Sequence, residues 1–176
     1  PDDFAKRRAK VMEQIGDGIA ILRGAELPEA YIKFRQDNNF YYLTGVEIPG
    51  AILIMNGKAK QVLLLVPDKN SGDIKKEAHI VVGEDAAKMY KVDAVLSTNS
   101  FTAILNNSAA RNNQPFYIVT APEETQEMSR DRCMALRVSR LNDPWDGRIA
   151  KEINFHNKLK ERYPSITIKD LTPILD

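Results

Sequence analysis

The stretch "AILIMNGKAKQVLLLV", residues 51–66, constrains the fold more than any other part of the chain. Two apolar runs flank Asn56-Gly57, a pair suited to the positive φ angles of a tight turn. The pattern predicts an antiparallel hairpin, whose loop the residues Lys58 to Lys60 could lengthen. Any fold proposed for this chain must therefore place two apolar antiparallel strands side by side in its sheet.

The segments before the hairpin add a helix and further strands. Residues 2–18 predict a helix with one apolar face, and "GIAILR" at 18–23 predicts a buried strand. Two short aromatic and β-branched runs, "AYIKF" at 30–34 and "FYYLTG" at 40–45, predict strands as well. Pro49-Gly50 has the residues that a type II turn prefers at its two central positions.

After the hairpin, predicted strands and helices alternate. The expected strands are 79–82, 93–97, 115–120 and 165–168, and the expected helices are 84–91, 100–111, a charged surface helix within 124–140, and 148–163. The last helix has an apolar stripe of Ile149, Ile153, His156, Leu159 and Tyr163. This order of elements predicts an α/β fold: a three-layer domain with a mixed β-sheet flanked by helices.

Composition and charge fit one globular domain over residues 1–176 and exclude several kinds of partner. Lys and Arg number 25 against 24 Asp and Glu, so the whole chain has no attraction to nucleic acid or to an anionic membrane. No apolar run approaches the ~20 residues that span a bilayer. Because Cys133 is the only cysteine, no internal disulfide can form, which fits a cytoplasmic location. The chain opens at Pro1 rather than Met, so export after removal of a signal stays open.

Residues that could hold a metal ion are few and scattered. A catalytic metal site needs three or more His, Asp, Glu or Cys side chains that converge. His79 and His156 are far apart in the sequence, and His156 lies on the apolar stripe, where a packing histidine is expected. Asp143 and Asp146 bracket Pro144-Trp145 and could bind a cation, but a turn with capping Asp side chains is the favoured interpretation. No metal site is predicted in this chain.

The residues also predict no nucleophile and no nucleotide site. Cys133 lies in the charged segment "RDRCMALR" with no partner histidine, so an inert thiol is expected. The sequence contains neither GxSxG, GxGxxG nor GxxxxGK[ST]. The basic stretch "SRDRCMALRVSR" has no interleaved aromatic residues for base stacking and is interpreted as a solvated helix face. Taken alone, the residues contain no complete active site, and a nucleotide-binding α/β domain is the weakest interpretation.

The stretch "FRQDNNFYYLTGVEIPGA", residues 34–51, resembles a signature of the N-terminal domain of Xaa-Pro aminopeptidases (aminopeptidase P), in the creatinase and prolidase group. The matching residues are Phe34, Arg35, Gln36, Phe40, Tyr41, Tyr42, Leu43, Thr44, Gly45, Pro49 and Gly50. The similarity extends to "GEDAAKMYKVDAVL" and to the closing "DLTPILD", which resembles the linker before the family's catalytic domain. The similarity is missing at "EAHIVVGED", where many members have a Trp-x-Gly-x-Arg motif and this chain has neither the Trp nor the Arg.

The resemblance implies that residues 1–176 are an accessory domain of a hydrolase. In the family, a downstream "pita-bread" domain holds two divalent metal ions, usually manganese, on two Asp, one His and two Glu, and cleaves Xaa-Pro peptide bonds. This chain has no counterpart of those ligands, so no cofactor is expected in it. The N-terminal domain of relatives covers the active-site mouth and mediates association. The expected partners are therefore the chain's own catalytic domain, neighbouring protomers of a homo-oligomer, and a peptide substrate.

Three residues of the signature are candidates for controlling substrate access: Arg35, Asn39 and Tyr41. The family often has Asp at the position of Asn39, where it can approach the N-terminus of a substrate, and Asn keeps hydrogen-bonding capacity without the charge. Arg35 is expected chiefly as a structural anchor, which pairs with Asp37 or with a carbonyl. Phe34, Phe40, Tyr42 and Leu43 have strand spacing and are expected to pack against the sheet.

A second hypothesis is a non-catalytic interaction module. Domains of this fold also occur in a histone-chaperone subunit that has lost peptidase activity, where the domain serves binding. The sequence that follows Asp176 separates the two hypotheses, because the Asp, Asp, His, Glu, Glu metal set is expected there only in a peptidase.

Overall fold

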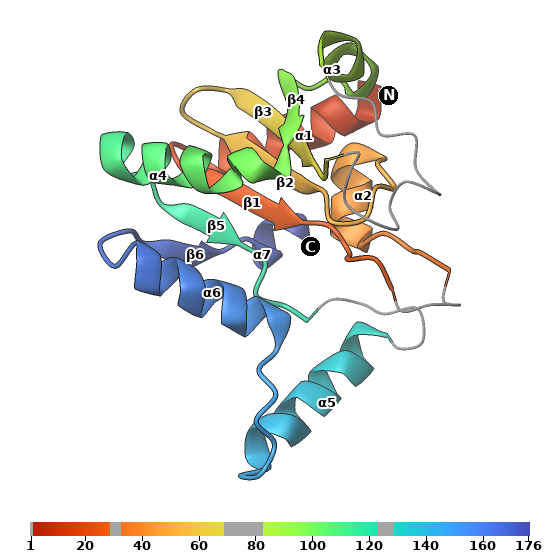
Figure 1. Ribbon diagram of the computed structural model, residues 1–176, viewed down its shortest axis with the longest axis vertical. Coiled ribbons are helices and arrows are strands. Elements are labelled where there is room, and N and C mark those ends of the chain that lie inside the picture. Colours follow the sequence, from red (N-terminus) through yellow and green to blue (C-terminus); the bar gives the residue numbers. More distant parts are fainter. Residues whose placement is uncertain (1, 29–32, 69–82, 123–128) are drawn as a thin grey trace.

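The computed structural model describes residues 2–28, 33–68, 83–122 and 129–176. Within these ranges the chain forms one six-stranded sheet in the order β4-β3-β2-β1-β5-β6 (Figure 1). The strands are β1 (Ile19–Arg23), β2 (Ile52–Asn56), β3 (Gln61–Val66), β4 (Ala94–Ser97), β5 (Phe116–Ile118) and β6 (Ile168–Asp170). Strand β2 is antiparallel to both of its neighbours, and the other pairs are parallel. The predicted mixed sheet is confirmed.

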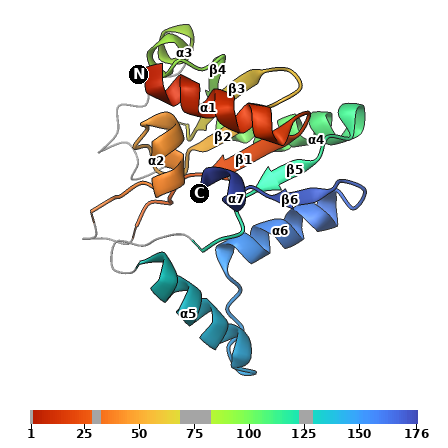
Figure 2. The ribbon, with the colours of Figure 1, turned by 180° about the vertical axis from the view of Figure 1, so that it is seen from behind.

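Helices cover both faces of the sheet and complete the predicted three layers. The helices are α1 (Asp2–Ile15), α2 (Asn38–Thr44), α3 (Glu84–Tyr90), α4 (Phe101–Asn112), α5 (Arg130–Asn142), α6 (Lys151–Arg162) and α7 (Thr172–Leu175), with a 3₁₀ turn, η2, at Thr98–Ser100. Figures 1 and 2 show α1, α2 and α7 on one face and α4 and α6 on the other. Helix α5 stands away from the sheet in both views.

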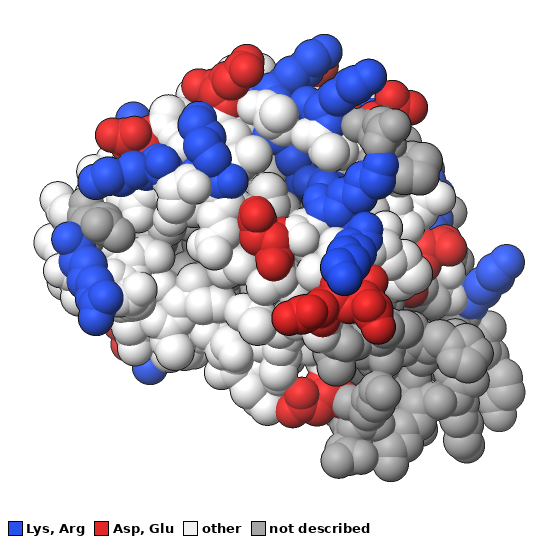
Figure 3. Space-filling view, turned by 90° about the horizontal axis from the view of Figure 1, so that it is seen from above, with Lys and Arg blue, Asp and Glu red and all other residues white. Residues whose placement is uncertain are grey.

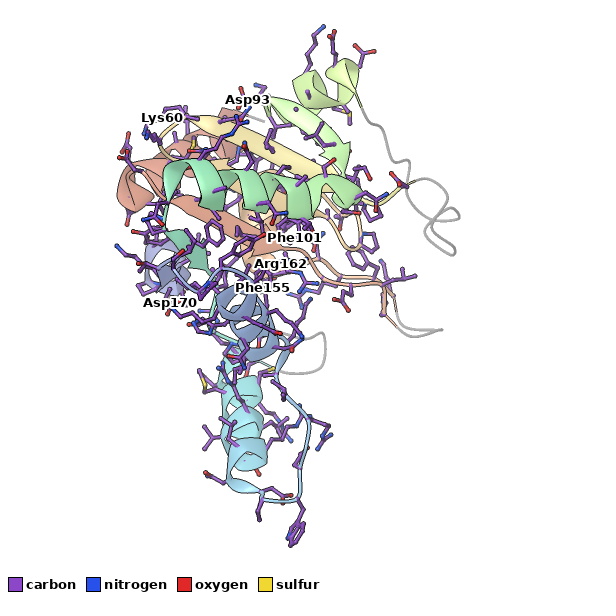
Figure 4. The ribbon with its side chains drawn as sticks, turned by 60° about the vertical axis from the view of Figure 1, so that its left-hand side comes forward. Lys60, Asp93, Phe101, Phe155, Arg162 and Asp170 are labelled. Carbon is purple, nitrogen blue, oxygen red and sulfur yellow. The ribbon has the colours of Figure 1, made fainter. Side chains whose placement is uncertain are left out.

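Strand β1 shows how one sequence serves two hydrophobic cores. Ala20 and Leu22 point into a core shared with α1, α2 and α7, whereas Ile19 and Ile21 point into a core shared with α4 and α6. All four side chains are at most 2% exposed, which explains why this strand lacks polar alternation. In the second core the rings of Phe101 and Phe155 approach each other between α4 and α6, with centroids 6.4 Å apart (Figure 4).

The hairpin prediction is confirmed, with a longer loop than two residues. Strands β2 and β3 pair from Ile52 with Leu65 to Asn56 with Gln61, and the positive φ of the loop falls at Lys60, not at Asn56 or Gly57. A Cβ at Gly57 would lie 1.9 Å from the carbonyl oxygen of Gly16, so this glycine permits a close approach of two backbones. The type II turn at Pro49-Gly50 is also confirmed, since Gly50 has φ +70°.

The strand predicted at residues 40–45 is wrong, because these residues form helix α2. Asp37 caps the helix by accepting a hydrogen bond from the amide of Phe40 at 2.8 Å, and Gly45 ends it in a left-handed conformation with φ +67°. Phe40 and Leu43 are fully buried at helical spacing, whereas Tyr42 is 50% exposed and does not pack in the sheet as expected. Cap residues at both ends outweigh the β-propensity of the aromatic run.

Among the described residues, the other elements differ from prediction at their ends or by a short shift along the chain. The last long helix begins at Lys151, so Ile149 lies outside it and is 63% exposed, while Leu159 and Tyr163 of the predicted stripe are buried. The strand predicted at 165–168 is shifted to β6. Helix α5 has no buried residue and is the surface helix that the charge pattern predicted. The run 30–34 falls mostly, and the strand predicted at 79–82 with His79 wholly, outside the described residues.

Candidate functional site

The sheet leaves a crevice where the connections that follow two neighbouring parallel strands diverge. Strands β1 and β5 are adjacent and parallel, so their carboxyl ends lie side by side at the same end of the sheet. The chain passes from β1 to α2 on one face and from β5 towards α6 on the other (Figures 1 and 2). In open α/β sheets, ligands bind in the crevice at such a divergence. A ligand site is therefore expected at this end of the sheet.

A cavity of about 70 Å³ occupies this crevice. Its walls come from the end of β1, the residues after β5, and the first turns of α2, α5 and α6: Ile21, Leu22, Arg23, Asp37, Asn38, Asn39, Val119, Ala121, Pro122, Arg130, Lys151, Glu152 and Phe155. Among the described residues of the lining there is no Ser, Cys or His side chain. The crevice thus offers apolar contact, hydrogen bonds and charge.

The cationic side chains of the crevice are held by acidic and aromatic partners. Glu26 lies 3.5 Å from Arg23 and 3.6 Å from Lys151, and the Arg23 guanidinium lies 5.1 Å from the centroid of the Phe155 ring. Arg130 pairs with Asp176 at 2.9 Å. These ion pairs are partly exposed, so their attraction is modest, but they fix the orientation of the guanidinium groups. The result is a crevice with ordered positive groups at its rim.

Gln36 fixes the backbone that leads into α2, and sequence reasoning assigned it no role. Its side-chain oxygen accepts hydrogen bonds from the amides of Ala25 at 2.7 Å and Asp37 at 3.0 Å. Its nitrogen donates to the carbonyls of Val46 at 3.1 Å and Ile48 at 3.2 Å. The side chain is only 6% exposed and satisfies its full hydrogen-bonding capacity. Gln36 therefore connects the segment after β1 with both sides of α2.

A buried arginine anchors the other end of α2. Arg8 on α1 is 1% exposed and donates to the carbonyl of Leu43 at 2.8 Å and to that of Lys91 at 2.6 Å. Burial lowers the pKa of Arg8, and the nearby charge of Asp93 opposes this shift. The guanidinium thus satisfies carbonyls at the carboxyl ends of two helices, α2 and α3.

The structure places only one of the three predicted site residues in the crevice. Asn39 is half-buried and lines it, beside the capping Asp37. Tyr41 is 46% exposed and does not line it. Arg35 is exposed and donates to the side-chain oxygen of Asn38 at 3.1 Å, so its anchor contact is with Asn38. A role of any of these residues towards a substrate stays a prediction.

The crevice also contains residues that sequence reasoning missed. Arg23 ends β1 and Lys151 begins α6, 128 positions later in the chain, and no pattern in the sequence indicates that they share one acidic partner. The available signal was weak: Arg23 ends the predicted strand 18–23, and Lys151 lies in the first turn of the predicted helix 148–163. Only the order of strands in the sheet, which puts β5 beside β1, brings these boundaries together.

The turn predicted at Asp143 and Asp146 is confirmed, but neither carboxylate caps α6, which Ala150 precedes without a side-chain cap hydrogen bond. Asp143 accepts a hydrogen bond from the amide of Trp145 at 2.9 Å, and Asp146 accepts from the amide and the guanidinium of Arg148. The hydrogen bonds from Arg148 hold the pKa of Asp146 well below its usual range. Both carboxylates thus serve local partners. Within the described ranges, no three His, Cys, Asp or Glu side chains are grouped so that they could hold a metal ion.

Surface charge and hydropathy indicate no second candidate site among the described residues. On the face shown in Figure 3, Lys and Arg side chains are interspersed with Asp and Glu. No described helix is both long and apolar enough to cross a bilayer. Cys133 and His156 are half-buried on α5 and α6, and the expectations of an inert thiol and a packing histidine remain predictions.

Comparison with known proteins identifies the family. A family model described as "Aminopeptidase P, N-terminal domain" matches residues 4–117. The chain belongs to this family. The match includes α2, Gln36 and both strands of the hairpin, and it ends within β5, before α5 and α6. The resemblance inferred from residues 34–51 is therefore confirmed.

Curated relatives are much longer than this aminopeptidase P N-terminal domain. A protein named "Probable Xaa-Pro aminopeptidase PEPP" from Coccidioides posadasii is 26% identical over 160 residues, which cover 88% of this chain and 33% of that protein. The protein of the same name from Uncinocarpus reesii is 26% identical over 175 residues, 94% of this chain and 35% of its own length. The chain thus spans about a third of the length of these relatives.

Solved structures show the same fold over the whole chain. An aminopeptidase P from Pseudomonas aeruginosa matches with a TM-score of 0.62 and 21% identity, over 99% of this chain and 37% of that one. Escherichia coli aminopeptidase P with the inhibitor Pro-Leu matches with a TM-score of 0.64 and 16% identity, over 99% of this chain and 37% of that one. At these identities the likeness establishes the α/β fold, and the three-layer prediction is confirmed.

Proposed function

We propose that residues 1–176 are the accessory domain of an Xaa-Pro aminopeptidase-like metallopeptidase, whose catalytic pita-bread domain follows in the full-length protein. The observation that carries this proposal is the family match over residues 4–117, in a chain that spans a third of its curated relatives. The crevice supports it, because its lining offers apolar contact, hydrogen-bonding groups and charge to a ligand. In this proposal, two divalent metal ions, manganese in the native enzyme, belong to the catalytic domain.

The crevice gives the accessory domain a way to act on a peptide substrate. Asn39 lines it and has an amide side chain that can donate and accept hydrogen bonds, and the nearby Asp37 accepts a hydrogen bond within α2. We propose that this end of α2 faces an active-site mouth, of its own or of a neighbouring protomer in a homo-oligomer. There it would limit the length of peptide that enters and would contact the substrate's N-terminal side.

Hydrolysis by the full-length protein tests the proposal as a whole. We expect cleavage of an Xaa-Pro peptide in the presence of Mn²⁺, loss of that cleavage with a chelator, and its return when the metal is added back. The isolated 176-residue chain should cleave nothing under the same conditions. Turnover by the isolated chain would contradict the accessory role. A full-length protein without activity and without the downstream metal ligands would favour the interaction module instead.

Substitutions at the predicted site residues test the role in substrate access. If Asn39 contacts the substrate, Asn39→Ala and Asn39→Asp should change KM for short Xaa-Pro peptides by several-fold, with a smaller effect on kcat. Tyr41→Ala and Arg35→Ala, which alter residues outside the crevice, should have weaker effects. Unchanged KM in both Asn39 variants would leave this stretch with a purely structural role.

A further inference from the structure

Residues 129–149 form an arm that carries an exposed apolar ridge. The arm consists of α5 and the loop after it, and it projects from the sheet (Figures 1 and 2). Met134, Val138 and Leu141 have the helical spacing of one side of α5, and they are 42%, 49% and 66% exposed. Trp145 follows at the tip and is 93% exposed. Large exposed apolar side chains that gather on one element mark interaction surfaces.

The tip presents Trp145 on an ordered turn. Asp143 accepts a hydrogen bond from the Trp145 amide at 2.9 Å, and the amide of Asp146 donates to the carbonyl of Asp143 at 3.2 Å. Arg148 then clamps Asp146 with Nε at 2.9 Å and Nη2 at 2.6 Å from the carboxylate oxygens. A large aromatic side chain on a preorganised backbone loses little entropy on binding, which is a property of residues that dominate interfaces.

The same arm has a hollow beside the ridge. A cavity of about 280 Å³ lies between α5 and the start of α6. Its apolar lining includes Leu136, Leu141 and Ile153, and Arg137, Arg140 and Arg148 also line it. A cavity of about 150 Å³ accepts a benzene molecule, so this hollow has room for an indole ring. The guanidinium groups would meet the face of such a ring favourably.

The tip and the hollow have complementary charge. Trp145 is flanked by two carboxylates, Asp143 and Asp146, of which Asp146 already pairs with Arg148 of the same chain. Besides Arg148, the described lining of the hollow includes the cationic Arg137, Arg140 and Lys151 and the acidic Glu152. Because Trp145 is 93% exposed, it does not occupy the hollow of its own chain. A knob and a matching hole on one surface are the requirement for a two-fold interface, in which each copy gives and receives the same contact.

We propose that the arms of two copies of this chain pair antiparallel about a two-fold axis, each with its Trp145 in the hollow of the other. The pairing would also cover Val138 and Leu141 of both ridges. The arm lies beyond the matched residues 4–117, so the family match does not account for this surface. The inference rests on the arm alone and holds whether or not the full-length protein is a peptidase.

Photo-crosslinking from the tip tests the contact directly. The full-length protein is made with p-benzoylphenylalanine in place of Trp145, as a mixture of unlabelled and ¹⁵N-labelled copies, and is irradiated. We expect mixed-isotope crosslinks from position 145 to peptides within residues 133–153 of another copy. Crosslinks to residues beyond 176, to another protein in a cell extract, or to no protein at all would each overturn the proposal.

Sedimentation of substituted proteins measures the strength of the contact. Trp145→Ala should raise the dissociation constant of the two-fold contact by about 30-fold or more, as for other central tryptophans of interfaces. Trp145→Phe should retain part of the affinity. Met89→Ala removes an apolar side chain that is 55% exposed on α3, away from the arm, and should change nothing. Equal dissociation constants for Trp145→Ala and the unsubstituted protein would refute the proposal.

Discussion

Helices α2 and α5 show two opposite ways in which a short helix is held in one chain. Helix α2 has only seven residues, but three of them are buried and Gln36, Asp37 and Gly45 fix its ends. Helix α5 has thirteen residues and none is buried. Isolated helices of either length are marginal in water. The longer helix should therefore be the less stable of the two, because tertiary contacts and not length decide stability.

Removing the buried aromatic side chain of α2 should have the largest effect. Phe40 is fully buried, so we expect Phe40→Ala to lower the free energy of unfolding by about 3–5 kcal/mol. The neighbouring Tyr41 is 46% exposed, and Tyr41→Ala should change it by less than about 0.5 kcal/mol. Urea denaturation followed by circular dichroism compares the two variants. If both variants lost a similar free energy of unfolding, α2 would not bury the face that carries Phe40 and Leu43.

The next largest effect is expected at Gln36. Gln36→Leu keeps much of the volume but leaves the amide of Ala25 and the carbonyls of Val46 and Ile48 without the partner they have in the structure. We expect a loss of about 2–3 kcal/mol in the free energy of unfolding, since unsatisfied buried polar groups are costly. Gln14→Leu, at an exposed position of α1, is the matched control and should have little effect. A loss below 1 kcal/mol for Gln36→Leu would argue against this role.

The helix caps allow a third comparison of α2 with α5. Asp37 caps α2 with its side chain, so Asp37→Ala should cost about 1 kcal/mol, and Asp37→Ser should recover most of it. Ser129 precedes α5 without a side-chain cap hydrogen bond, so Ser129→Ala should be neutral. Thermal unfolding of the three variants measures the difference. A cost for Ser129→Ala equal to that of Asp37→Ala would show that the two helix starts are alike.

The sheet could be predicted from the sequence because its signals are local and strong. Apolar runs such as 52–56 and 61–66 are bounded by turn residues, and their strand assignment did not depend on distant contacts. Helix α2 was missed because an aromatic run was interpreted by its β-propensity, although a helix signal was present. Asp37, the apolar residues at 40 and 43, and Gly45 are together the pattern of a capped short helix.

The crevice could not be predicted, because its residues meet only through the order of the strands. Asn39 was singled out from the family signature, and its position in the crevice depends on β5 lying beside β1. The described residues between these two strands form three other strands, and no local pattern specifies which of them becomes a neighbour of β1. The burial of Arg8 could not be predicted either. Arg8 belongs to a predicted amphipathic helix, and its side chain is almost fully buried. Its carbonyl partners lie 35 and 83 positions away in the chain.

Asp170 at the sheet and Asp146 on the arm should differ in how they make stability depend on pH. Partial burial raises the pKa of Asp170, but hydrogen bonds from Thr172 and Thr120 outweigh it and hold that pKa below its usual 3.8. A lowered pKa in the folded state stabilises the protein above the ordinary pKa, about 4, and this stabilisation is lost as the pH falls through the folded-state value. Asp170 connects the end of β6 to the residues after β5, so its charge should contribute to the stability of the sheet.

We therefore expect the urea midpoint to fall between pH 6 and pH 3, and to fall less in Asp170→Asn. The partner of Asp146 on the arm is two residues away, so that pair can persist when the body unfolds. Asp146→Asn should accordingly show the same pH dependence as the unsubstituted protein. If both variants flatten the pH dependence equally, the arm and the sheet unfold together.

The smallest effect on global stability is expected within α5. Ala135 is exposed at the middle of this helix, and Ala135→Gly should cost about 1 kcal/mol of local helix stability. Because no residue of α5 is buried, local opening should not require unfolding of the sheet. Hydrogen exchange should therefore become faster for the amides of residues 134–142, while the urea midpoint stays unchanged. A midpoint lowered in proportion to the local loss would show that α5 is coupled to the core, as α2 is.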